Sequence, residues 1–169
     1  MNLFIKIPEE TGVFIMVRRS IALLSAMLFQ LGFGPVAIAG DQDAPKRQAE
    51  AVRQVLDSQV TAWNKGDLKG FMTGYWKSEK LTFFSGDKIE HGWQATYERY
   101  QKRYQAEGRE MGKLTFSELD IEMIGSDTAW VRGRWKLVTS KDSPGGLFTL
   151  ILKKFPEGWR IVHDHTSAV

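Results

Sequence analysis

The strongest constraint on the fold lies in the final third of the chain, where four runs of alternating apolar and polar residues follow one another. They span residues 113–125, 127–139, 146–155 and 158–167. Alternation with a period of two predicts strands that bury one face. The short links between them are turn sequences rich in Gly, Ser, Asp and Pro, so successive strands are expected to pair antiparallel. The chain therefore ends in an antiparallel sheet that needs a covering layer.

Helical patterns come earlier in the chain and can supply that layer. From residue 46 to 64, apolar residues recur at spacings of three and four, and Gly66 suits the turn that follows. A short second helix is predicted over 68–76 and a third over 93–108, with a strand at 81–85 between them. Helices ahead of a run of strands indicate the α+β class, with a curved antiparallel sheet and helices on one face.

The N-terminal region has the pattern of an export signal. Arg18 and Arg19 precede an apolar run at 21–39 that ends in the small-residue triplet Ala37-Ile38-Ala39. A positive segment, an apolar segment and an A-x-A site together predict a signal peptide over residues 1–39.

Cleavage of that signal leaves a short leader at 40–45 and a folded domain at 46–169. The mature protein is then expected in the periplasm or outside the cell, with no attachment to the membrane. Met16 is an alternative start for the signal peptide. The other interpretation is an uncleaved membrane anchor, although polar, Gly and Pro residues interrupt the apolar run.

Composition excludes several classes of function. The chain has no cysteine, which excludes a disulfide framework, a thiolate metal site and a cysteine nucleophile. Its net charge is +3, and basic and acidic residues are interleaved, as in residues 98–110. A nucleic-acid-binding protein would be expected to gather its bases on one face, so no nucleic-acid partner is expected. The motifs of nucleotide-binding proteins, zinc proteases and serine hydrolases are missing, and no cofactor is expected.

Four segments carry a resemblance to a known family. They are AWNKGDLKGFMTGYW (62–76), GWQATYERY (92–100), GSDTAWVRGRWKL (125–137) and LFTLILKKFPEGWRIVHDHTS (147–167). Together they resemble SnoaL-like domains of the nuclear transport factor 2-like superfamily. That superfamily includes polyketide cyclases, ketosteroid isomerases and the association domains of calcium/calmodulin-dependent kinase II. The resemblance implies a cone-shaped sheet wrapped around the N-terminal helices, a pocket inside it, and homodimers paired through their sheets. It leaves the reaction open.

The last strand supplies the candidate catalytic residues, His163 and His165. Strict alternation places both on the face of Trp159, with Asp164 on the opposite face. A histidine with a pKa near 6.5 can accept a proton at neutral pH, so either ring is a candidate base. The alternative is a structural role between strands or at a dimer contact. A metal would need a third ligand, so no metal site is predicted.

The candidate ligand-binding residues come from a strand and from all three helices. Arg132 lies on a strand that resembles the pocket-lining strand of kinase association domains, and its guanidinium would hold a carboxylate or other anion. The alternative is a surface arginine paired with an acidic residue of the neighbouring strand. Hydroxyl donors and apolar walls are expected from four further aromatic residues, Tyr97, Tyr100, Trp63 and Tyr75.

Two functions therefore remain open. In the first, an exported domain binds a small, partly apolar molecule, with an anionic molecule as one option. It acts either as a binding module or as an isomerase, lyase or cyclase. In the second, the domain is a non-catalytic dimerisation module with a vestigial pocket. Whether the chain is an enzyme is not decided at this level.

Overall fold

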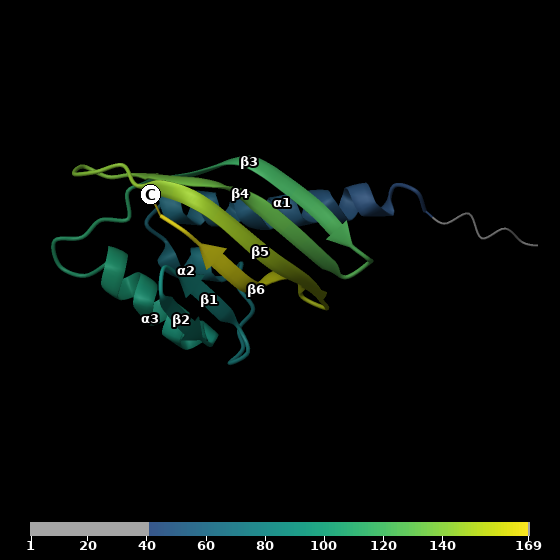
Figure 1. Ribbon diagram of the computed structural model, residues 1–169, viewed down its shortest axis with the longest axis horizontal. Helices are drawn as coiled ribbons and strands as arrows, with labels where there is room; N and C mark the ends of the chain where they lie inside the picture. The colour runs from purple at the N-terminus through teal and green to yellow at the C-terminus, as the bar shows by residue number, and fades with distance from the viewer. Residues whose placement is uncertain (1–40, 169) are drawn as a thin grey trace, which may run out of the picture. The chain divides into compact units, whose positions relative to one another are not determined.

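Residues 41–168 are described by the computed structural model, and they form three helices and six strands (Figure 1). The predicted export signal at 1–39 lies outside these described residues. The elements are α1 (Ala44–Asn64), α2 (Leu68–Met72), β1 (Thr82–Ser85), β2 (Lys88–His91), α3 (Trp93–Tyr104), β3 (Lys113–Ile124), β4 (Thr128–Val138), β5 (Gly145–Phe155) and β6 (Gly158–Thr166).

The six strands form one sheet in the order β2-β1-β6-β5-β4-β3. β3 to β6 pair antiparallel in sequence order, while the parallel pairing of β1 with β6 brings an early strand beside the last one. The curved sheet is covered by α1 on one face, and α3 lies beside β2 at the β1–β2 end (Figure 1). The predicted α+β fold is confirmed.

The core forms where the apolar stripe of α1 meets the inner face of the sheet. Val52, Leu56 and Trp63 of that stripe are buried, and they face inner-face residues such as Leu152 and Ile161. Each fully buried residue of this kind stabilises the fold by roughly 1.5–3 kcal/mol relative to an exposed one. None of the described helices is long and apolar enough to cross a membrane.

The second helix is shorter than predicted, because the chain leaves it to join the sheet. α2 ends at Met72, and Tyr75 forms an isolated parallel bridge with Ile161 of β6. The Ile161 amide donates to the Gly74 carbonyl at 2.9 Å, and the Trp76 amide donates to the Ile161 carbonyl at 2.9 Å. These two hydrogen bonds hold Tyr75 beside β6.

An extra residue in β6 changes which side chains face the core. Ile151 pairs with His163 while the next residue, Leu152, pairs with Ile161, so Val162 has no partner on β5. A bulge of this kind breaks the period of two. Beyond it, Asp164 faces inward and His163 faces outward, so the predicted alternation through this strand is wrong.

Candidate functional site

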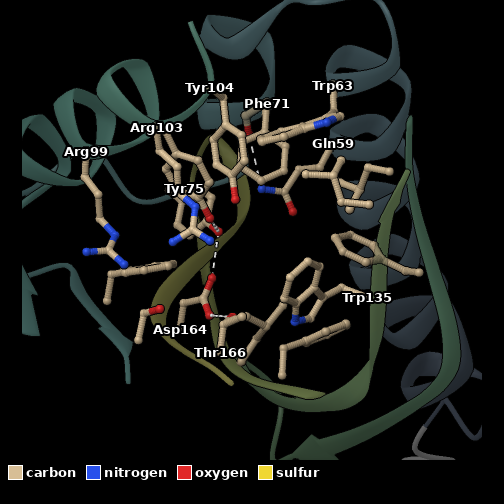
Figure 2. A pocket seen from close by; sticks show the side chains of 18 of the residues that line it. Gln59, Trp63, Phe71, Tyr75, Arg99, Arg103, Tyr104, Trp135, Asp164 and Thr166 are labelled. Atoms are coloured by element: carbon tan, nitrogen blue, oxygen red, sulfur yellow. Dashed lines mark hydrogen bonds between the residues drawn. The ribbon is translucent and has the colours of Figure 1, made fainter. Parts of the chain in front are cut away.

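A cavity of about 100 Å³ lies between the helices and the inner face of the sheet (Figure 2). α1, α2 and α3 line one side of it, and β1 and β3 to β6 line the other. The exposed residues Arg103 and Ala168 mark where it reaches the surface.

The walls of the cavity are mainly aromatic. The ring of Trp63 makes edge-to-face contacts with Phe71 at 4.9 Å, Tyr100 at 5.9 Å and Tyr104 at 4.8 Å between centroids. Its indole N–H donates to the Met111 carbonyl at 2.8 Å, which satisfies the only polar atom of the side chain. On this side, a ligand would meet mainly aromatic rings, and the one polar atom of the Trp63 ring is already paired.

A buried carboxylate interrupts this apolar surface. Asp164 is 3% exposed, and its two oxygens accept hydrogen bonds from the Tyr75 hydroxyl at 2.7 Å and the Thr166 hydroxyl at 2.6 Å. Burial raises the pKa of Asp164 to about 6, although the hydrogen bonds from Thr166 and Tyr75 oppose that rise. A carboxyl group with this pKa can both take up and release a proton near neutral pH.

Three tyrosine hydroxyls accompany the carboxylate. The hydroxyls of Tyr75 and Tyr100 are 3.5 Å apart, and Figure 2 shows the Tyr104 hydroxyl turned into the cavity. Burial and the Asp164 charge raise the pKa of Tyr75 and Tyr100 well above the usual value, and burial raises that of Tyr104. These groups therefore stay protonated and can donate hydrogen bonds.

Two arginines of α3 stand at the edge of the cavity. Arg99 pairs with Glu90 at 3.4 Å, and its guanidinium lies over the Phe83 ring. Arg103 is exposed, with its guanidinium 5.5 Å from the centroid of the Tyr104 ring. Within residues 41–168 no carboxylate pairs with Arg103, which leaves its charge available to an anion.

The structure brings three of the predicted ligand-binding residues into the lining: Trp63, Tyr75 and Tyr100. Tyr97 is not among the lining residues, and the expectation that it faces the cavity is wrong. Its ring stacks on Trp93 at 5.2 Å, and Trp93 in turn donates to the Met72 carbonyl. The aromatic residues of α3 share one stripe, but only Tyr100 and Tyr104, in the C-terminal half of the helix, line the cavity.

Arg132 lies on the outer face of the sheet, so the expectation that it binds an anion in the cavity is wrong. It pairs with Asp120 and Glu122 of β3, and its guanidinium is 4.0 Å from the Trp130 ring centroid. The period of two along β4 directs Val131 inward and its neighbour Arg132 outward, as in the second of the two interpretations.

The two predicted catalytic histidines also lie outside the cavity, because of the bulge at Val162. The Nδ1 atom of His163 is 2.6 Å from the Thr82 hydroxyl, and the rings of His163 and His165 lie against Phe84. Burial and the neighbouring His165 lower the pKa of His163. Among residues 41–168, no group of three or more His, Asp or Glu side chains is placed to hold a metal ion.

Sequence reasoning missed Asp164, Arg103 and Gln59 as residues of this site. Gln59 could have been found from the sequence, because it is a polar residue at an otherwise apolar position of the α1 stripe. Arg103 lies one residue before Tyr104, in the C-terminal half of α3 that borders the cavity. Nothing local revealed Asp164, because the bulge that turns it inward is a property of strand pairing.

The family follows from comparison with known sequences. The profile of the SnoaL-like domain matches residues 52–169. The chain belongs to this family. Comparison with curated protein sequences gives no significant match.

Solved structures resemble the SnoaL-like domain over most of their length. An NTF2-like protein of unknown function from Shewanella oneidensis MR-1 is 39% identical with a TM-score of 0.66, and the match covers 70% of this chain and 97% of that one. A ketosteroid isomerase-like protein from Erwinia carotovora atroseptica SCRI1043 is 18% identical with a TM-score of 0.60, over 72% and 96% of the two chains. The second likeness shows a shared fold alone.

Proposed function

We propose that this SnoaL-like domain binds a small, largely apolar molecule in its cavity and that Asp164 exchanges a proton with it. The observation that carries the proposal is the buried Asp164 carboxylate in a wall of aromatic rings. Ionised groups are costly to bury, and they concentrate where chemistry uses them. A carboxylate with a pKa of about 6 beside hydroxyl donors suits an isomerase, lyase or cyclase.

The proposed step is proton transfer next to a carbonyl group. The Asp164 carboxylate takes a proton from the carbon beside the carbonyl, and the C–H electron pair forms a carbon–carbon double bond. The carbonyl π pair moves onto oxygen, where the Tyr104 hydroxyl donates a hydrogen bond. Return of the proton to a different carbon completes an isomerisation and restores the carboxylate.

The size of the cavity limits the substrate. The volume of about 100 Å³ is below the roughly 150 Å³ of a cavity known to hold benzene. A substrate of about one ring therefore fits with part of it at the mouth, whereas several fused rings do not.

A one-ring carbon acid tests this proposal. We expect the domain to convert 3-cyclohexen-1-one to 2-cyclohexen-1-one, and Asp164→Asn to lower that rate at least a hundredfold because the general base is lost. The measurement is the rise in ultraviolet absorbance of the conjugated product. Asp120→Asn, on the outer face of the sheet, is the matched control and should keep the rate. Equal rates for wild type and Asp164→Asn would contradict the assigned role.

A second candidate function rests on the outer face of the sheet. There Trp130, Ile151 and His163 form a cross-strand row, and Leu147 and Ile151 are 52% and 37% exposed. We propose that two copies pair through this face as a homodimer. If pairing were the whole function, the domain would be an association module and changes at Asp164 would leave its biological activity intact.

We also propose that the domain acts after export, as the N-terminal sequence predicts. The sequence has no cysteine, so an exported domain must depend on its hydrophobic core for stability.

A further inference from the structure

Gln59 is a buried polar residue that the proposed proton transfer does not use. It is 2% exposed and occupies the stripe of α1 that otherwise carries Val52, Leu56 and Trp63. A glutamine in an apolar helix stripe is costly unless its amide is fully paired. The partners of its amide nitrogen and amide oxygen therefore indicate the role of this side chain.

The amide group has one orientation. Its nitrogen donates to the Phe71 carbonyl at 3.1 Å, and a carbonyl oxygen can only accept, so the NH₂ group must face Phe71. The Oε1 atom then points the opposite way, into the cavity (Figure 2).

Gly74 leaves the space that this arrangement needs. A Cβ atom at position 74 would lie 2.7–2.8 Å from the Gln59 side chain, closer than packed atoms can approach. The segment after α2 thus holds the glutamine stem in place while Phe71 holds its nitrogen. The acceptor is fixed in position before any ligand arrives.

The described residues give the Gln59 side chain one hydrogen bond, through its nitrogen. The Oε1 atom is not among the sealed and unpaired polar atoms of these residues, so it is reached from the cavity that Gln59 lines. An acceptor that is reached only through a cavity bonds to whatever occupies that cavity, water or a ligand donor.

Arg103 supplies a second recognition point on the other side of the cavity. It projects from α3 toward the space that Gln59 faces from α1 (Figure 2). Its guanidinium offers charge and paired donors to a carboxylate. The two residues therefore present an acceptor at one side of an aromatic chamber and a cation at the other.

We propose that the ligand is a one-ring acid whose hydroxyl or N–H group donates to Gln59 Oε1 while its carboxylate binds Arg103. This inference rests on the proposed function, because it names the class of molecule that the same cavity takes. It assigns Gln59 to donor recognition, Arg103 to anion recognition and Asp164 to proton transfer.

Two acids of nearly equal shape test the role of Gln59. We expect wild-type protein to bind 4-hydroxybenzoate about tenfold more tightly than 4-methylbenzoate, the size of effect expected when a buried acceptor gains a partner. Isothermal titration calorimetry of both acids gives the ratio. In Gln59→Leu, which has no acceptor, the ratio should fall to about one. Circular dichroism verifies that the variant is folded.

Arg103 is tested with the same two probes. Arg103→Gln should weaken both acids by about tenfold and keep their ratio, because the lost contact is common to them. Lys102→Gln, its exposed neighbour on α3, is the matched control and should change neither affinity.

The outcomes separate this inference from the proposed function. Equal wild-type affinity for the two acids, or a preference that persists in Gln59→Leu, contradicts the inference. Failure of both acids to bind also contradicts it. Turnover of 3-cyclohexen-1-one that depends on Asp164 would still support the proposed function in each of these cases. If Gln59→Leu does not fold, the wild-type ratio alone decides.

Discussion

At the scale of single residues, the buried Asp164 carboxyl links the proposed proton transfer to the stability of the fold. Its carboxyl group has a pKa of about 6 in the folded protein, against an ordinary value of 3.8. The folded state therefore holds the proton more tightly than the unfolded state. A group useful for proton transfer is, for the same reason, a burden on the fold at neutral pH.

The first prediction concerns the pH dependence of stability. The Asp164 contribution to the free energy of unfolding is most favourable below about pH 4, where the group is protonated in both states. It falls as pH rises from about 4 to about 6 and is then constant. The total loss is about 3 kcal/mol, from a pKa shift of roughly two units. Urea unfolding of wild type and Asp164→Asn between pH 4 and 7.5 measures this contribution as their difference.

Asp164→Asn should show no such loss, because it carries no charge. Relative to wild type it should therefore become more stable as pH rises, while its isomerase rate is lost. A wild-type stability that rises relative to the variant over the same interval would contradict the raised pKa.

At the scale of elements, two contacts between segments shape the cavity. The bulge at Val162 turns Asp164 inward, and the parallel bridge of Tyr75 with Ile161 brings the hydrogen-bond donor of that carboxylate to it. The segment after α2 also meets α1, where Gly74 faces the side chain of Gln59. A substitution on one segment is therefore expected to shift the side chain that it contacts on the other segment.

The second prediction tests the contact between Gly74 and Gln59. Gly74→Ala should destabilise the domain by about 1–3 kcal/mol, because the new methyl group overlaps the glutamine. In a Gln59→Ala background the same change should cost much less, since the space is then free. Thermal unfolding of the wild type, the two single variants and the double variant gives the coupling energy. Additive effects would show that the two residues do not share this space.

At the scale of the whole molecule, the two faces of the sheet differ in what they contact. The inner face packs on α1 and forms the cavity, and the outer face exposes Leu147 and Ile151 beside paired charges such as Arg132 with Glu122. Exposed apolar side chains bordered by charges suit the proposed pairing with a second copy.

The third prediction combines assembly with export. Full-length chain expressed in a bacterium should be recovered from the periplasm as a dimer of chains that begin at Gly40, as measured by native mass spectrometry. Ile151→Lys should give monomers, because it places a charge among these exposed apolar side chains. Gln54→Lys, on the exposed side of α1, should remain dimeric. A monomeric wild-type protein would remove the association-module function.

The sequence by itself determined the order of helices and strands, the α+β class and the family. Hydrophobic periodicity is local, so it identifies α1 from its buried stripe and β4 from its alternation. The cone that the family resemblance implies placed Trp63, Tyr75, Tyr97 and Tyr100 at the pocket, and all of these except Tyr97 line the cavity.

Only the tertiary structure decided which polar residues face the cavity. Val162 has no partner on β5, and beyond this bulge Asp164 faces inward where alternation would have placed the histidines. Arg132 is turned outward because the strand's covered face is the one that carries Val131. The orientation of Gln59 depends on Phe71 and Gly74, and these contacts form only when the chain has folded. Side-chain facing depends on strand register and packing, which are set by distant segments and have no local pattern.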